Sequence, residues 1–194
     1  MITVIGIGSI QARANRWIAF AIEMETNNLV ACTSSNQSEN EARTNLEDTL
    51  RRFRRLHEFD KTQLVSRSSK VGTRLVQLLE GNGQPFALNE ISQTNWSRAR
   101  LSISKQLLKV PRGKVISYGS LAKISNSSPR GVGSVMRSNP VPWAVPCHRV
   151  IHSDGTLGKL GGTTSGTQEK SRILRAEGVF VRDNNTVDRK SMLI

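Results

Sequence analysis

Residues 117–140 read SYGSLAKISNSSPRGVGSVMRSNP, and the residues in this stretch that begin and end helices decide the fold of the C-terminal half. Ser128 suits the N-cap of a helix, a proline follows at the first helical position, and Asn139-Pro140 ends the helix. The pattern predicts two short helices, Ser117 to about Ser125 and Ser128 to about Ser138. Two helices with so short a connection are typical of a helix-turn-helix.

The second of these helices has two different faces. Its apolar residues suit a core: Val132, Val135 and Met136. Small and basic residues share the opposite face: Arg130, Gly133, Ser134 and Arg137. Glycine in an exposed helix interior costs about 1 kcal/mol relative to alanine, so Gly131 and Gly133 indicate that something rigid approaches the helix backbone closely. A nucleic-acid groove meets this requirement, and two helices packed over the glycines are the alternative.

The remaining segments predict an α+β protein. Alternating apolar residues and capping signals predict, in order, a hairpin with one buried face (Asn15 to Ser34), a helix from Ser38 to about His57, a helix near Val71 to Leu79, a short strand (Phe86 to Ile91) and a helix from Trp96 to Val110. We expect a small α/β N-terminal domain over residues 1–90. A mainly helical C-terminal domain with the helix-turn-helix follows over residues 91–194.

The positive charge is concentrated in the C-terminal half. The net charge is +13, and residues 95–194 hold 17 Lys and Arg against 5 Asp and Glu. Residues 1–94 are nearly balanced, with 11 against 10. Such a field attracts polyanions and is expected of a nucleic-acid binder, although a basic surface that only favours solubility is the alternative.

The two cysteines, Cys32 and Cys147, lie far apart and form no zinc-binding pattern. We therefore expect no metal and no disulfide framework, which fits a reducing compartment. The apolar N-terminus lacks the features of a signal peptide, and no stretch approaches membrane-spanning length. The expected location is the cytoplasm, in association with the nucleoid, or the nucleus in a eukaryote.

Cys147 lies in a stiff segment, because three prolines restrict the backbone of residues 139–150. A thiol is a useful nucleophile only as the thiolate, and so needs a base or a cation nearby. His148 and Arg149 follow Cys147 directly. Adjacency alone is weak support, since neighbouring side chains often point apart and a Cys-His pair is more often structural.

The complete string of motifs is more specific. It reads Val110-Pro111-x-Gly113-x-Val115-x-Ser117-Tyr118, Arg130-x-Val132-Gly133, Met136-x-x-Asn139-Pro140, Pro146-Cys147-His148-Arg149-Val150 and Leu174-x-x-Glu177-Gly178. In order and spacing it resembles the O(6)-alkylguanine-DNA alkyltransferases over residues 96–180. The resemblance implies that the protein binds double-stranded DNA, rotates an O(6)-alkylated guanine out of the stack and transfers the alkyl group irreversibly to its own cysteine. O(4)-alkylthymine is a further candidate lesion.

The resemblance also implies residue roles. Cys147 would be the nucleophile, His148 the base acting through a water, Glu177 the group that orients His148, and Tyr118 a donor to the leaving guanine. In DNA and substrate binding the implied residues are Arg130 as a finger that fills the vacated stack, Asn139 as a link between helices and loop, Met136 as a pocket wall, and Gly133, Ser134, Arg137 and Val150. No cofactor is implied, and a monomer is expected, with cooperative binding along DNA left open.

One segment departs from the family pattern. The family's Tyr-Ser-Gly-Gly stretch is replaced by residues 159–166, KLGGTTSG, in a slightly longer loop. The preferred alkyl group therefore cannot be carried over.

Two other classes of protein are alternatives. A DNA-binding module without transfer activity, either an alkyltransferase-like protein or a helix-turn-helix regulator, would not need Cys147. A cysteine hydrolase using Cys147 with His148 or His152 would leave the basic half without a purpose.

Overall fold

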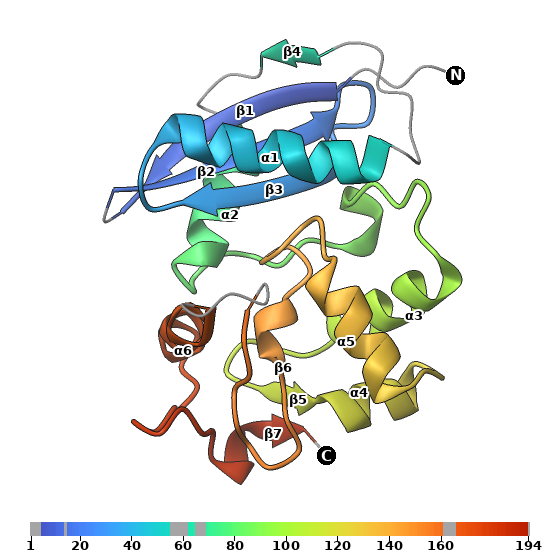
Figure 1. Ribbon diagram of the computed structural model, residues 1–194, viewed down its shortest axis with the longest axis vertical. Helices are drawn as coiled ribbons and strands as arrows, with labels where there is room; N and C mark the ends of the chain where they lie inside the picture. Colours follow the sequence, from blue (N-terminus) through green and yellow to red (C-terminus); the bar gives the residue numbers. More distant parts are fainter. Residues whose placement is uncertain (1–4, 14, 55–61, 65–68, 161–165, 194) are drawn as a thin grey trace. The chain divides into compact units, whose positions relative to one another are not determined.

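The computed structural model describes residues 5–13, 15–54, 62–64, 69–160 and 166–193, and the chain folds into two compact units (Figure 1). Unit 1 comprises residues 1–78, 83–95 and 140–144. Unit 2 comprises residues 79–82, 96–139 and 145–194. The predicted boundary near residue 90 stays a prediction, since each unit also takes short pieces from the other's part of the sequence.

Unit 1 is built on a four-stranded sheet in the order β3-β2-β1-β4. Its strands are β1 (Ile5–Ala12), β2 (Arg16–Glu23), β3 (Leu29–Ser35) and β4 (Thr62–Leu64). The predicted hairpin is present as the antiparallel β2–β3 pair, with Asn27 at positive φ in its turn. The sequence reading missed β1, which pairs antiparallel with β2 and parallel with β4.

The prediction that only one face of this hairpin is buried is wrong. All five residues from Ile18 to Ile22 are buried. Helix α1 (Glu39–Arg54) lies across one face of the sheet (Figure 1). Ala19 and Ala21 are on this face and pack against Ala42, Leu46 and Leu50 of the helix. Helix α2 (Lys70–Leu79) lies against the opposite face, where Phe20 contacts Gly72.

Two further elements were predicted for unit 1, a helix that begins at Ser38 and a strand from Phe86 to Ile91. Helix α1 is capped as predicted, since the Ser38 hydroxyl accepts a hydrogen bond from the Glu41 amide (3.1 Å). Its expected end near His57 lies outside the described residues. The predicted strand Phe86 to Ile91 is wrong, because Leu88–Glu90 forms a 3-10 turn (η1) that Glu90 closes by accepting from the Ala87 amide.

The described part of unit 2 contains four α-helices, and the bounds of the first three follow the predicted ones closely. The helices are α3 (Arg98–Leu107), α4 (Tyr118–Ile124), α5 (Pro129–Arg137) and α6 (Gly166–Ala176). Ser97, Ser117 and Ser128 are N-caps, and each side chain accepts a backbone N–H three residues on. Helices α3, α4 and α5 pack against one another.

Unit 2 also contains a small parallel sheet, which the prediction of a mainly helical domain did not include. Its order is β6-β5-β7, with β5 (Val115–Ser117) between β6 (Val150–Ile151) and β7 (Met192–Leu193). A 3-10 turn, η2 (Cys147–Arg149), leads directly into β6, and another, η3 (Arg189–Ser191), leads into β7. The chain as a whole therefore mixes helix and sheet, as expected.

In the described part of the chain, no helix is long and apolar enough to cross a membrane. The same residues contain no cluster of three or more potential metal ligands from His, Cys, Asp and Glu.

Candidate active site

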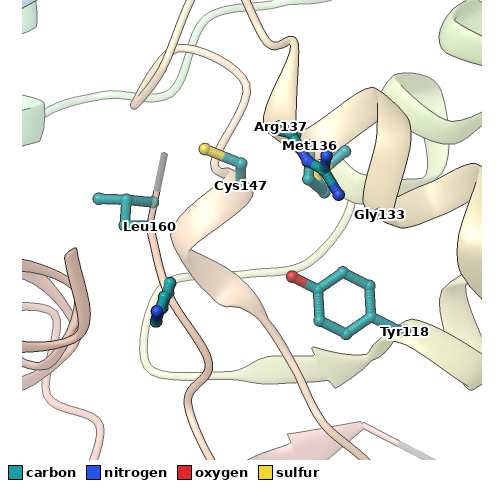
Figure 2. Close-up of a pocket in the computed structure, with 7 residues that line it drawn as sticks. Tyr118, Gly133, Met136, Arg137, Cys147 and Leu160 are labelled. Atoms are coloured by element: carbon teal, nitrogen blue, oxygen red, sulfur yellow. The ribbon is translucent and has the colours of Figure 1, made fainter. Parts of the chain in front are cut away.

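Cys147 begins the η2 turn and borders a cavity of about 210 Å³ in unit 2 (Figure 2). Its side chain is 7% exposed. The cavity is lined by Tyr118, Gly133, Met136, Arg137, Cys147, Lys159 and Leu160. The structure therefore brings together five residues that the sequence singled out and adds Lys159 and Leu160 from the divergent loop, whose residues 161–165 lie outside the described part.

Asn139 holds the loop that carries Cys147. Its Nδ2 donates to the Val145 carbonyl over 2.9 Å, so the two ends of the Pro140–Ala144 segment are linked. The Asn139 side chain also hydrogen-bonds Cys147. Asn139 therefore holds the backbone two residues before Cys147 and also contacts Cys147 itself.

A buried triad follows Cys147. Nε2 of His148 lies 2.9 Å from Oε1 of Glu177, which comes directly after α6. Arg149 donates to both carboxylate oxygens, from Nη2 to Oε1 (2.7 Å) and from Nε to Oε2 (2.9 Å). All three residues are buried, and Arg149 is anchored further through Nη1 to the Val110 carbonyl (2.7 Å).

The electrostatics of the triad fix its protonation. Burial alone would raise the pKa of Glu177, but hydrogen bonds from His148 and Arg149 outweigh it and lower the pKa to about 2. Burial also lowers the pKa of His148, against the opposing effect of Glu177. Near neutral pH the pair is therefore a carboxylate and a neutral imidazole.

This state assigns the histidine tautomer. The ionised carboxylate can only accept, so Nε2 carries the ring proton and Nδ1 holds the lone pair. Nδ1 is buried and has no protein hydrogen-bond partner among the described residues. The arrangement can therefore accept a proton at Nδ1 of His148.

The protonation equilibrium of Cys147 is shifted towards the thiol. Burial raises its pKa, while the Asn139 side chain, the Lys170 ammonium and the amides of Cys147 and His148 act in the opposite direction. A thiol in this state needs a base in order to react, which fits a neutral imidazole at the next residue.

Tyr118 lies at the start of α4 and directs its hydroxyl into the space between Cys147 and α5 (Figure 2). Burial, followed by the charge of Cys147, raises the pKa of Tyr118, so it remains a hydrogen-bond donor. His152, the other histidine considered, is exposed and stacks near Tyr118 with ring centroids 5.4 Å apart. The buried carboxylate is paired with His148 instead.

Other candidate residues lie outside the cavity wall. Arg130 and Ser134 are exposed on α5, whereas Val150 is buried on β6. A Cβ at Gly133 would meet no atom of the described residues within 4 Å, so packing among these residues does not explain this glycine. At Gly131 it would come 2.8 Å from the Ser127 hydroxyl, within the turn before α5.

The sequence reading missed two residues of the site. Arg149 was noted only as a charge next to Cys147, whereas its guanidinium binds Glu177. Lys170 was not singled out, yet it is 1% exposed and influences the charge of Cys147. Its position three, four and seven residues before Ile173, Leu174 and Glu177 placed it on the buried stripe of α6, which was a usable signal.

Comparison with known proteins supports the motif-based resemblance. Residues 99–179 match the family model described as "6-O-methylguanine DNA methyltransferase, DNA binding domain". Methylated-DNA–protein-cysteine methyltransferases are similar, with 53% identity over 70 residues in Thermococcus kodakarensis (36% of this chain, 38% of the relative) and 38% over 99 residues in Saccharolobus solfataricus (51% and 63%). The chain thus spans less than two thirds of these relatives' length, and the resemblance is confirmed for its C-terminal half.

Solved structures show the same fold over most of the chain. The O6-methylguanine-DNA methyltransferase of Pyrococcus kodakaraensis matches with a TM-score of 0.69 and 24% identity, covering 91% of this chain and all of the other. The Mycobacterium tuberculosis O6-methylguanine methyltransferase matches with a TM-score of 0.62 and 23% identity, covering 90% and 93%. The N-terminal part, which carries no recognisable motif, is therefore included in the shared fold.

Proposed function

We propose that this protein repairs DNA by transferring an alkyl group from O6 of guanine to Sγ of Cys147. The observation that carries the proposal is the buried Nδ1 of His148, which has no hydrogen-bond partner in the described part of the chain, is held in its basic tautomer by Glu177 and lies in the residue next to a buried cysteine. The names of the curated relatives support the same activity.

The transfer follows from these groups. The Cys147 thiol gives its proton, through a water, to Nδ1 of His148, and Glu177 stabilises the imidazolium. The thiolate attacks the alkyl carbon, the S–C bond forms as the C–O6 bond breaks, and the electron pair remains on guanine. Tyr118 donates a hydrogen bond to this anion, which takes up a proton from water while the His148 imidazolium returns to water the proton that it received from Cys147. The thioether has no route back to the thiol, so each molecule acts once and needs no cofactor.

DNA binding is assigned to α4 and α5 acting as a helix-turn-helix. The exposed face of α5 carries Arg130, Ser134 and Arg137 around the unobstructed Gly133, so a polyanion can approach its backbone. Since O6 is unreachable inside a duplex, the damaged nucleotide rotates into the cavity beside Cys147. Arg130, which is long, planar and cationic, fills the vacated stack. We propose that the protein acts as a monomer on O(6)-alkylguanine. O(4)-alkylthymine is a further proposed substrate.

A single-turnover labelling experiment tests the proposal. The protein is incubated with a duplex containing O(6)-methylguanine and its peptides are analysed by mass spectrometry. We expect the mass of one methyl group on the Cys147 peptide and none on the Cys32 peptide, which serves as an internal control. Cys147→Ser should bind the duplex and remain unlabelled. Folded wild-type protein that binds the duplex but gains no methyl group on Cys147 would refute the proposal.

A further inference from the structure

Lys170 is a buried cation in unit 2. It lies on α6 and is 1% exposed. Its Nζ donates to the carbonyl oxygens of Val150 (2.6 Å) and Leu157 (2.5 Å). Among the described residues, no carboxylate forms an ion pair with it. Lysine is almost never fully buried unless it is paired, because removing its charge from water is costly.

The two carbonyls that hold Lys170 come from segments that adjoin residues lining the cavity. Val150 begins β6, directly after the η2 turn that contains Cys147. Leu157 precedes Lys159 and Leu160, which line the cavity. The ammonium therefore ties the segment after the cysteine to the segment that leads into the cavity wall. An apolar residue would fill the space but would leave both carbonyls without this donor.

The charge of Lys170 acts on the groups that exchange the proton. Burial lowers the pKa of Lys170 to about 8, and the charge of Cys147 opposes this decrease, so the ammonium is retained at neutral pH. In return, Lys170 lowers the pKa of Cys147 against the effect of burial. Burial and then Arg149 and Lys170 lower the pKa of His148 against the effect of Glu177, which keeps its imidazole neutral.

We propose that Lys170 is a positioning residue for alkyl transfer, whose buried ammonium, held by the carbonyls of Val150 and Leu157, favours the thiolate form of Cys147. This explains why a lysine occupies a core position where no carboxylate of the described residues pairs with it. The consequence for transfer rests on the proposed function. The consequence for thiol reactivity does not, since it concerns the free protein.

The test measures thiol reactivity without DNA. Full-length protein is treated with iodoacetamide across a range of pH, and the modification rate of the Cys147 peptide is followed by mass spectrometry. Lys170→Gln removes the charge and keeps a donor, Lys170→Met removes both, and Lys170→Arg keeps the charge. We expect the uncharged variants to react about tenfold more slowly at pH 7, with a midpoint about one unit higher, since one unit of pKa is a factor of ten. Lys170→Arg should restore most of the reactivity.

Arg172→Gln is the matched control on the same helix. Arg172 is half-exposed and pairs with Glu169, so its loss tests whether removing any cation from α6 has the same effect. Its profile should equal that of the wild type. A folded Lys170→Gln or Lys170→Met protein with the wild-type pH profile would overturn the proposal, whatever happens to its melting temperature. If wild-type protein instead shows the expected profile but accepts no methyl group from DNA, the proposed function fails and the role of Lys170 in thiol reactivity stands.

Discussion

Glu177 is held by two cationic or proton-donating neighbours at once: Arg149 binds both of its oxygens, and Nε2 of His148 lies 2.9 Å from Oε1. The carboxylate is an electrostatically unfavourable group at the C-terminal end of α6, and these partners offset that cost. The same carboxylate therefore stabilises the fold and orients the histidine.

Glu177→Gln is expected to destabilise the protein and slow transfer together. The amide has nearly the same shape but leaves the Arg149 guanidinium buried without a counter-charge, which typically costs about 3–5 kcal/mol. Urea unfolding measures the loss. The matched control is Glu169→Gln, whose partner Arg172 is 43% exposed, and which should cost at most about 1 kcal/mol. Equal losses in the two variants would contradict the role assigned to the buried pair.

The stability should fall with acid in two stages. The pKa of His148 is lowered by folding, so its contribution is complete above the unfolded value near 6.5 and is lost as the pH falls below it. The pKa of Glu177 drops from 4.5 to about 2, so its contribution is lost between these values. At 1.36 kcal/mol per unit, the second stage amounts to about 3 kcal/mol.

Urea midpoints measured from pH 7 down to about pH 2 check the two stages. Glu177→Gln should retain only the first stage, because a glutamine does not titrate. A Glu177→Gln profile that still declines as steeply as the wild type below pH 4.5 would show that other carboxylates dominate.

Gly133→Ala should separate stability from DNA binding. A Cβ at Gly133 meets no atom of the described residues within 4 Å, so alanine should stabilise α5 by about 1 kcal/mol through helix propensity. The same methyl group would stand on the face proposed to approach DNA, and affinity for an undamaged duplex should fall several-fold in fluorescence anisotropy. The control is Gly119→Ala on α4. Among the described residues, a Cβ at Gly119 would approach the Ser117 hydroxyl alone, at 3.8 Å. Unchanged affinity in Gly133→Ala would argue against this approach.

The parts of the fold that the sequence predicted are those governed by local chemistry. Helices α3, α4 and α5 begin after serines whose side chains cap the neighbouring amides, and this needs no knowledge of distant residues. The failures depend on tertiary partners. The run Ile18–Ile22 is buried on both faces because α1 and α2 cover the sheet from opposite sides. Phe86 to Ile91 has a strand-like composition, but Glu90, which Arg74 of α2 binds, accepts from the Ala87 amide and closes a 3-10 turn.

In the site, too, local features could be predicted from the sequence and features that depend on tertiary partners could not. Cys147 and His148 are adjacent in sequence, and the family resemblance implied Glu177 as the group that orients His148. Arg149 and Lys170 were not assigned, because a basic residue is read as exposed unless its buried acceptors are known. Those acceptors lie far along the chain: Val110 and Glu177 for Arg149, and Leu157 and Val150 for Lys170.

Arg130→Ala should impair transfer from a duplex far more than reaction with free O(6)-benzylguanine. Arg130 is exposed on α5 and does not line the cavity, so it has no contact with an isolated base bound beside Cys147. Without the guanidinium, the extruded nucleotide leaves an unfilled stack, and unstacking costs a few kcal/mol, so transfer from DNA should slow roughly tenfold or more. Single-turnover rates on the two substrates measure the ratio. Lys123→Ala, which removes an exposed cation from α4, controls for the loss of charge alone and should preserve the ratio. If Arg130→Ala slowed transfer equally from both substrates, Arg130 would have a role in folding or in the cavity, and the proposal that it fills the vacated stack would be wrong.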